Sequence, residues 1–234
     1  SVEAIIAVWL TLRWWISYDY SFGEAAWLGI FHSVTAFNNA GFALFSDSLM
    51  GFAADPLILL PITAAIILGG LGVPVLYELT RRKRRLGLHS RVTLWMSGAL
   101  VGYGMIALTL AEWTNPATMG DQSAGTKLLT AWFQSVSPRT AGFNTVDYAD
   151  MRPESWLITD TLMFVGGGSV STSGGIRVTT LAVLLLVIRA QARGDRDTTA
   201  GGRRLSQALT QQALLITVLF AALSFAGTLG LMAL

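Results

Sequence analysis

The chain has 234 residues, of which 53% are hydrophobic and only 13% charged, and its formal net charge is +2. Soluble domains carry about 25% charged residues, so this composition, with a mean hydropathy of +0.55, excludes an ordinary water-soluble domain and predicts a membrane protein. Because there is no cysteine, disulfides and thiolate metal sites are excluded as well, and the redox compartment stays open.

Long uncharged runs predict the membrane-spanning helices. Residues 56–77, 92–111 and 213–234 each reach the roughly 20 residues that a spanning helix needs. Residues 161–188 form a fourth run, which a glycine-rich stretch interrupts. The apolar residues 1–16 lack the basic start and cleavage site of a signal peptide, and we interpret them as the outer end of a helix that begins earlier. Because the last run also stops at the final residue, the sequence is expected to be a fragment of a longer protein.

Positive charge is concentrated in two short segments that flank these runs. Residues 81–91 and 189–204 hold eleven of the 16 lysines and arginines: Arg81, Arg82, Lys83, Arg84, Arg85, Arg91, Arg189, Arg193, Arg196, Arg203 and Arg204. The positive-inside rule places both segments on the cytoplasmic side. Ten of the 14 acidic residues fall in the opposite connections, where they would concentrate cations. Basic runs can also bind nucleic acid or anionic lipid, but at a helix end they are better interpreted as topology anchors with an added docking role.

One segment occurs twice. Residues 31–42 are Phe-His-Ser-Val-Thr-Ala-Phe-Asn-Asn-Ala-Gly-Phe, and residues 133–143 are Phe-Gln-Ser-Val-Ser-Pro-Arg-Thr-Ala-Gly-Phe. With the basic segments inside, both copies lie outside, between spanning helices. Their helical parts, residues 24–37 and 123–136, are too short to cross a bilayer and are predicted to be re-entrant half-helices. The extended backbone after each is tolerable at membrane depth only where it lines a watery cavity.

This pattern predicts a cation path lined by backbone carbonyls. A cation that loses its water needs several carbonyl oxygens, and Gly41 and Gly142 permit the backbone angles that aim successive carbonyls the same way. The C-terminal ends of the half-helices add partial negative charge. The predicted filter residues are Asn38, Asn39, Ala40, Gly41, Phe42, Arg139, Thr140, Ala141, Gly142 and Phe143. The cation would be held by the carbonyls of Asn39, Ala40, Gly41, Thr140, Ala141 and Gly142.

The side chains around these glycines have supporting roles. We expect Asn39 and Thr140 to bond behind or beside the filter, and Phe42 and Phe143 to wedge each turn against neighbouring helices. A chance recurrence of Ala-Gly-Phe is the alternative, and the shared Phe-x-Ser-Val that precedes both copies argues against it. Since the copies differ by one residue, the two loops cannot be identical in shape.

Residues 166–175 have the poorest helix propensity in the chain, with five glycines and four hydroxyl residues in ten positions. Unpaired amides in lipid would cost several kcal/mol each, so this stretch must face the pore or protein. A phosphate cradle is excluded because the Lys-Ser/Thr of a P-loop is missing, whereas close packing of small residues against another helix stays open. Arg177 is expected near this loop or at the inner mouth.

The remaining candidates are interpreted as structural. His32 and His89 have no partner at metal-ligand spacing and are expected to be structural or solvated. Pro61 and Pro74, with Gly-Gly-Leu-Gly at 69–72, are expected to kink their helix and allow close packing. No catalytic grouping is present in the sequence, so no enzyme is expected.

Four motifs of the sequence are considered together. They are the first copy of the repeat at 31–42, Leu-Gly-Gly-Leu-Gly-Val-Pro-Val-Leu-Tyr at 68–77, Pro-Arg-Thr-Ala-Gly-Phe-Asn-Thr at 138–145, and the stretch 166–175 followed by Ile-Arg. Together they resemble the Trk/Ktr family of bacterial potassium-uptake membrane subunits, over essentially the whole chain, and the Ktr type looks closer. The resemblance implies potassium as substrate, bound by the filter carbonyls, with sodium as a stimulating ion and no bound cofactor. It also implies multi-pass insertion in the cytoplasmic (inner) membrane.

The resemblance further implies four helix–pore-loop–helix repeats around one pore. This chain would hold most of the second repeat (1–80), the third (92–188) and the first helix of the fourth (205–234), with cytoplasmic segments 81–91 and 189–204 between them. The implied gate is an intramembrane loop under the filter, made of Gly166, Gly167, Gly168, Ser169, Ser171, Thr172, Ser173, Gly174, Gly175 and Arg177. The implied partners are a cytosolic nucleotide-binding regulatory subunit, a second copy in a homodimer of the full-length subunit and membrane lipid, without nucleic acid.

Two other hypotheses stay open. A secondary cation transporter with discontinuous helices would carry ionisable residues at mid-membrane, and apart from Arg177 none is evident. A non-conducting structural fragment of such a transporter is supported by the filter segments of the first and fourth repeats, which this sequence lacks.

Overall fold

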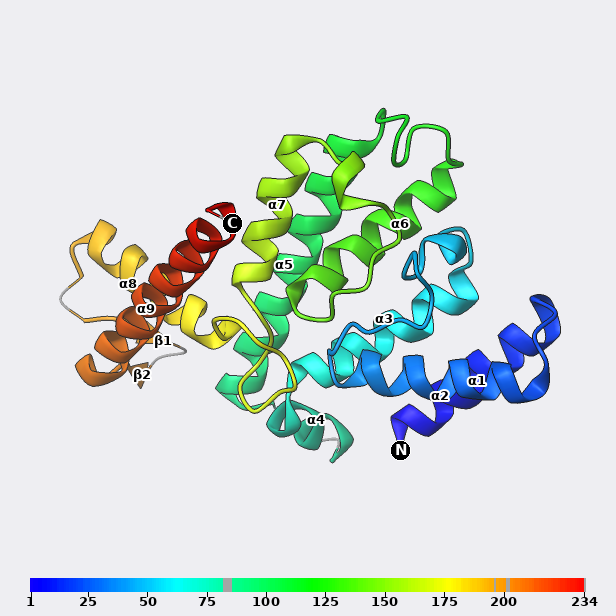
Figure 1. Cartoon of the computed structure of the whole chain (residues 1–234). Coiled ribbons are helices and arrows are strands. Elements are labelled where there is room, and N and C mark those ends of the chain that lie inside the picture. The colour runs from blue at the N-terminus through cyan, green and yellow to red at the C-terminus, as the bar shows by residue number, and fades with distance from the viewer. Residues whose placement is uncertain (82–85, 196, 201–202, 234) are drawn as a thin grey trace.

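The computed structural model describes residues 1–81, 86–195, 197–200 and 203–233, and nearly all of its regular structure is helical (Figure 1). The α-helices in these ranges are α1 (Val2–Ser17), α2 (Phe22–Phe37), α3 (Pro56–Leu71), α4 (Val73–Thr80), α5 (Leu88–Glu112), α6 (Ala124–Val136), α7 (Pro153–Phe164), α8 (Val178–Arg193) and α9 (Gln207–Met232). Short 3-10 turns are η1 (Met50–Phe52), η2 (Ser137–Arg139) and η3 (Tyr148–Asp150), and β1 (Thr199–Ala200) pairs antiparallel with β2 (Arg203–Arg204). The predicted all-α fold is confirmed, and β1, β2 and an isolated bridge between Val165 and Ile176 are the β-structure in the described ranges.

Helices α1, α2 and α3 pack together and hold the main core (Figure 1). Leu10, Trp14 and Ile62 are completely buried there. Helices α1 and α2 approach closely at Gly29, where a β-carbon would lie 2.7 Å from the Ala7 carbonyl oxygen. Helices α5, α6 and α7 form the next group, and α8 lies with α9 (Figure 1). Because α3 also contacts α6, the two copies of the repeat come together.

Helices α2 and α6 are the short helices predicted from the repeat. Each begins at a serine N-cap, with the Ser21 hydroxyl accepting from Glu24 N–H and the Ser123 hydroxyl from Thr126 N–H, both at 3.3 Å. Such caps satisfy backbone donors that have no partner inside the helix. With 16 and 13 residues, neither helix is long enough to cross a bilayer. The prediction of two half-length helices is confirmed.

The run 56–77 was predicted to be a spanning helix with a kink, and in the structure it is two helices, α3 and α4, which meet at a bend of 105°. Gly72 makes the bend with φ 89°, in the left-handed region that glycine adopts readily. Pro74 stands in the first turn of α4, where its missing N–H leaves no helical bond unmade. Pro61 lies inside α3, which continues through it. The expected kink is therefore present, but Gly72 rather than Pro61 produces it.

Helices α5 and α9 are each long and apolar enough to cross a membrane, and the bent pair α3 and α4 passes the same test when taken together. These helices contain most of the predicted runs 92–111 and 213–234. The run 161–188 is divided, as predicted, between α7 and α8, and residues 165–177 between them are not helical. A broken helix at this point is confirmed.

Part of the predicted basic segments, namely Arg82, Lys83, Arg84, Arg85 and Arg196, lies outside the described residues. At the end of α4 the exposed Arg81 guanidinium lies 4.4 Å from the centre of the Tyr77 ring. The exposed Arg204 pairs with Asp197 at 2.7 Å. The cytoplasmic side of these segments stays a prediction.

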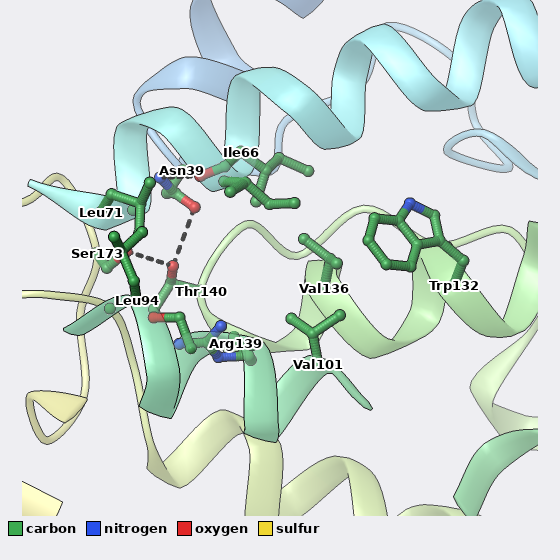
Figure 2. A pocket seen from close by; sticks show the side chains of 15 residues that line it. Asn39, Ile66, Leu71, Leu94, Val101, Trp132, Val136, Arg139, Thr140 and Ser173 are labelled. Carbon is green, nitrogen blue, oxygen red and sulfur yellow. Dashed lines mark hydrogen bonds between the residues drawn. The ribbon is translucent and has the colours of Figure 1, made fainter. Parts of the chain in front are cut away.

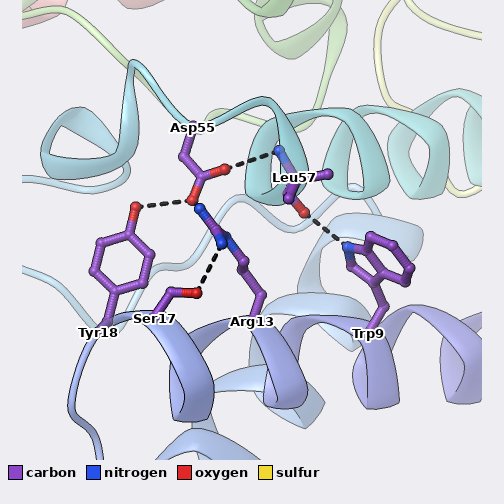
Figure 3. A network of polar contacts seen from close by, with 6 residues as sticks. All are labelled: Trp9, Arg13, Ser17, Tyr18, Asp55 and Leu57. Carbon is purple, nitrogen blue, oxygen red and sulfur yellow. Dashed lines mark hydrogen bonds and ion pairs between the residues drawn. The ribbon is translucent and has the colours of Figure 1, made fainter.

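A polar network joins the end of α1 to the start of α3 (Figure 3). Asp55, only 6% exposed, caps α3 by accepting from Leu57 N–H at 2.9 Å. Arg13 Nε and the Tyr18 hydroxyl each donate to the same carboxylate at 2.8 Å. Burial, followed by the hydrogen bond and the negative charge of Asp55, raises the pKa of Tyr18 to about 12. The network holds α1 and α3 at a set separation.

Candidate functional site

The two copies of the repeat bring their glycine turns into direct contact. Gly41 has φ 72° and Gly142 has φ 91°, where any side chain would be strained. A β-carbon on Gly41 would lie 1.7 Å from the Ala141 carbonyl oxygen, and one on Gly142 would lie 3.8 Å from the Gly41 α-carbon. Residues 39–42 and 140–143, far apart in the sequence, therefore lie side by side.

The carbonyl oxygens predicted as cation ligands accept no hydrogen bond from the described residues. No hydrogen bond from the part of the chain that the structure describes reaches the carbonyls of Asn39, Ala40, Gly41, Thr140, Ala141 or Gly142. The amides of the second turn point elsewhere, since Thr140, Ala141 and Gly142 all donate to the Ser137 carbonyl, at 3.3, 2.9 and 3.0 Å. Free carbonyl oxygens beside the C-terminal ends of two half-helices can replace part of a cation's water shell.

Asn39 and Thr140 join the two turns to each other and to the glycine-rich loop (Figure 2). The Thr140 hydroxyl lies 3.1 Å from Asn39 Oδ1 and 3.0 Å from Ser173 Oγ. Asn39 Nδ2 donates to Thr172 Oγ1 at 2.8 Å. Asn39 has φ 52°, a conformation that asparagine tolerates better than most residues. Both side chains therefore form hydrogen bonds, and their place behind or beside a filter stays a prediction.

The two phenylalanines do not have the matching roles that the repeat suggested. Phe143 is completely buried, with its ring 6.3 Å from that of His32, whereas Phe42 is 68% exposed. The ring of His32 also stacks on that of Phe45, so Phe143 packs into an aromatic cluster, whereas Phe42 lies on the surface of the described residues. Within the described residues, the prediction that Phe42 packs its turn against neighbouring helices is wrong. Phe143 does pack in this way.

His32 is a buried structural residue, as expected. Its Nδ1 bonds to the Leu28 carbonyl at 2.8 Å, and Leu44 N–H lies 3.4 Å from Nε2. Both ring nitrogens therefore have backbone partners. His89 is exposed at the start of α5. No cluster of three or more His, Cys, Asp or Glu side chains that could hold a metal ion occurs in the described ranges.

The glycine-rich residues 166–175 lie against the C-terminal end of α3. Gly168 N–H donates to the Gly70 carbonyl at 2.8 Å. A β-carbon on Gly167 would lie 2.4 Å from that same carbonyl oxygen, and one on Gly168 would lie 2.3 Å from the Leu71 carbonyl oxygen. Glycine is required here by the close approach of two backbones. The close packing of small residues, left open by the sequence, is confirmed.

Hydroxyl groups tie this loop to both turns. The Thr172 hydroxyl donates to the Phe37 carbonyl, the last of α2, at 3.1 Å while accepting from Asn39. Ser173 bonds to Thr140 from the other copy of the repeat. The loop is therefore in contact with the two turns at the same time.

The rest of the loop closes on itself and on α8. A β-carbon on Gly166 would lie 1.8 Å from the Gly174 carbonyl oxygen, and Gly175 has φ 72°. The Ser169 hydroxyl lies 3.1 Å from that of Thr179 on α8. Both ends of the loop are thus anchored to regular structure.

Arg177 forms hydrogen bonds to three parts of the loop. Its Nη1 donates to the Gly168 carbonyl at 3.2 Å, the Ser171 hydroxyl at 3.1 Å and the Ser173 carbonyl at 2.6 Å. No carboxylate in the described ranges pairs with it, and its hydrogen-bond partners there are oxygens of the loop. The expectation that Arg177 lies beside the loop is met.

Arg139 and Asn38, both among the predicted filter residues, lie at the ends of helical turns. Arg139 ends the 3-10 turn η2, which forms because the Ser137 carbonyl collects the next amides. Its Nη2 donates to the Gly166 carbonyl at 2.9 Å, and its Nε is buried without a partner among the described residues. Asn38 caps α2, with Nδ2 donating to the Val34 carbonyl at 2.9 Å.

The packing of residues 166–175 on the C-terminal end of α3 was not expected from the sequence. Residues 69–72 predict a kink and close packing, but their carbonyls also receive the loop amides of Gly168 and Thr172. The signal available was the run of glycines in two separate stretches, 69–72 and 166–168, each of which permits the close approach that the other requires.

Two contacting half-helix turns, and a broken helix whose loop lies against both, define a helical membrane protein built of helix–re-entrant loop–helix units. A family model described as a cation transport protein, TrkH, matches residues 2–86 and 78–232, and the chain belongs to this family. The resemblance found in the sequence motifs is thereby confirmed.

Individual relatives agree with this assignment. The chain is 37% identical over 233 residues to the Ktr system potassium uptake protein B of Bacillus subtilis (strain 168), covering 99% of this chain and 52% of the relative. It is 43% identical over 188 residues to the protein of the same name from Vibrio alginolyticus, covering 79% and 41%. The crystal structure of the potassium transporter TrkH from Vibrio parahaemolyticus matches with a TM-score of 0.75 at 19% identity, over 98% of this chain and 49% of that one. The chain spans about half the length of the curated relatives it matches.

Proposed function

We propose that this chain supplies two neighbouring segments of a potassium-selective filter, and the loop that gates it, to a larger uptake protein of the cytoplasmic membrane. The observation that carries the proposal is the contact between the Gly41 turn and the Ala141 carbonyl. Two filter segments around one axis must meet in this way, whereas two unrelated re-entrant loops need not.

Potassium is the proposed substrate because the ligands are main-chain carbonyls. The carbonyls of Asn39, Ala40 and Gly41 accept no hydrogen bond within the described ranges, so they are available to a cation that sheds its water. Relatives named potassium uptake proteins support the same ion. Sodium as a stimulating ion is part of the proposal, and no cofactor is assigned to this chain.

Residues 166–175 are the proposed gate. They touch both turns through Thr172 and Ser173, and they are held by hydrogen bonds that another arrangement of the loop could exchange. A gate of this kind is a two-state element, and a regulator acts on it by contacting one state more favourably than the other. Arg177, with three loop oxygens as partners, would stabilise the closed state.

In the whole protein we propose four repeats around one pore, with residues 1–80 and 92–188 as the second and third and 205–234 beginning the fourth. The proposed regulator is a cytosolic nucleotide-binding subunit that docks on the basic segments 81–91 and 189–204. The relatives' names, which refer to a Ktr system, support a partner component. A homodimer of the full-length subunit, surrounded by lipid and without nucleic acid, completes the proposed assembly.

The filter is tested by ion uptake through the larger uptake protein to which we assign this chain, which is called the full-length parent below. We expect Gly41→Ser and Gly142→Ser to weaken the preference for potassium over sodium while leaving membrane insertion intact, because a side chain opposes the φ angles that aim the carbonyls. Gly125→Ser is the matched control, since that glycine lies in α6 with its nearest neighbour 4.0 Å away. If both filter mutants keep the parental selectivity, the filter assignment is wrong.

Complementation separates the other hypotheses. A potassium-uptake-deficient bacterium should be rescued by the full-length parent. An absolute requirement for a coupling ion, rather than stimulation by sodium, would favour a secondary transporter. If the full-length parent inserts but never restores uptake, a structural role is favoured instead.

A further inference from the structure

A cavity of about 210 Å³ lies between α3, α5 and α6, next to the two turns (Figure 2). One end is polar, formed by Asn39, Arg139, Thr140 and Ser173. The remaining wall is mostly apolar, and Ile66, Val101 and Val136 in it are 4%, 8% and 3% exposed. An apolar cavity of about 150 Å³ stays dry and accepts a small hydrocarbon such as benzene, so a cavity of this size can hold a segment of hydrocarbon.

The cavity exists because the stripe of α5 that faces it carries only a small side chain at Ser97 and none at Gly98. Leu94, Ser97, Gly98 and Val101 line it at the spacing of a single helix face. Where Ser97 and Gly98 face the hollow, larger residues would fill it, and a β-carbon on Gly98 would meet nothing within 4 Å.

The mouth of the cavity opens at the middle of a spanning helix. Gly98 is exposed although it lines the cavity, and on the same helix Trp95 and Ile106 are 77% and 64% exposed. Gly98 is six residues from the start of the uncharged run 92–111, or about 9 Å along the axis, which is well inside a hydrocarbon core of roughly 30 Å. Only acyl chains are present at that depth, and head groups do not reach it.

We propose that this cavity is a lateral binding site for the hydrocarbon chain of a membrane lipid, which enters past Gly98 between α3 and α5. The acyl chain packs against the apolar wall, and the polar end limits how far the acyl chain penetrates. Because Asn39, Thr140 and Ser173 form that end, a bound chain lies directly against the bridge between the two turns and the loop.

Photolabelling of the full-length parent in phosphatidylcholine bilayers tests the site. The probe is a phosphatidylcholine that carries a diazirine in the middle of one acyl chain, and adducts are located by mass spectrometry. We expect adducts at the buried Ile66, Val101 or Val136, as well as at the exposed Ile106. These side chains are almost completely buried and line the cavity, so adducts on them report an acyl chain inside it.

Filling the mouth should remove this labelling selectively. Gly98→Leu should lower adducts at the buried positions by about tenfold, whereas Gly102→Leu, on the same helix and also with nothing within 4 Å but outside the cavity, should leave them unchanged. Ile106 adducts and a monodisperse elution profile report that each variant is folded and inserted. Ser97→Leu is the second filling variant should Gly98→Leu fail to insert.

Two results would overturn the proposal. In the first, Ile106 is labelled in the parent while Ile66, Val101 and Val136 are not, so that water or another part of the protein occupies the cavity. In the second, both filling variants keep parental labelling at the buried positions, so that the chain does not enter past Gly98. Neither result concerns ion selectivity, so the acyl-chain site and the filter are tested independently.

Discussion

Gly41 and Gly142 occupy equivalent places in the repeat but meet different surroundings. Both have positive φ, which costs an L-residue roughly 1–2 kcal/mol. A β-carbon on Gly41 would overlap the Ala141 carbonyl, whereas one on Gly142 has free space up to 3.8 Å. The two positions are therefore expected to tolerate a methyl group unequally.

We predict that Gly41→Ala is the more damaging change. Gly142→Ala should lower stability by about 1 kcal/mol through backbone strain alone, and Gly41→Ala should lower it further because the two turns must also separate. The measurement is the thermal unfolding midpoint of the purified full-length protein, together with its potassium-to-sodium uptake ratio. Equal effects of the two substitutions on both quantities would contradict the contact between the turns.

At the scale of secondary-structure elements, the junction of α1 and α3 depends on the protonated phenol of Tyr18, which donates to Asp55 beside Arg13. Because the folded-state pKa is raised from 10.0 to about 12, the stability from this bond is complete below pH 10. It is lost as the pH rises from 10 towards about 12.

We predict that Tyr18→Phe lowers the stability by about 1 kcal/mol below pH 10, and that the difference from the parent shrinks as the pH rises above 10. The thermal unfolding midpoint measured against pH checks this. Tyr20→Phe is the control, since no hydrogen bond of its hydroxyl occurs within the described ranges. A difference between Tyr18→Phe and the parent that does not change with pH would show that the hydroxyl does not stabilise the junction.

The loop between α7 and α8 gives a second prediction at this scale. Deleting residues 169–172 removes the bonds of Thr172 to Asn39 and to the Phe37 carbonyl. We expect higher potassium flux that depends less on the regulator, with unchanged selectivity. Flux into proteoliposomes with and without the regulator is the measurement.

Thr172→Val is the companion variant, because it removes the same hydroxyl bonds and keeps the length of the loop. It should raise flux less than the deletion does. If the deletion variant is folded and inserted but its flux equals that of the parent, the loop is a packing element and the gate assignment fails.

For the whole molecule, the distribution of basic residues sets the orientation across the membrane. We predict that a single cysteine at the exposed Gly87, in a full-length parent free of other cysteines, reacts with an impermeant maleimide only from the cytoplasmic side. Replacing the five basic residues 81–85 by glutamine should yield labelling from both sides. Labelling of Gly87→Cys from outside intact cells would invert the proposed topology.

Much of the fold and of the site could be predicted because the signals are local. The short helices α2 and α6 follow from apolar runs of limited length after Ser21 and Ser123, and the broken helix follows from five glycines within ten residues. The duplicated turn followed from the recurrence of Ala-Gly-Phe. Such features depend on neighbouring residues only, so the chain itself carries them.

The sequence by itself determined the membrane class, the half-helices, the paired turns and the interruption between α7 and α8. Only the tertiary structure decided that Gly72 turns α4 by 105°, that Phe143 is buried while Phe42 is exposed, and that residues 166–175 sit on the carbonyls at the end of α3. The physical reason is that these outcomes depend on which distant backbone occupies a space. Local propensity sets the angles that a glycine can adopt, but the neighbour that packs against it selects one.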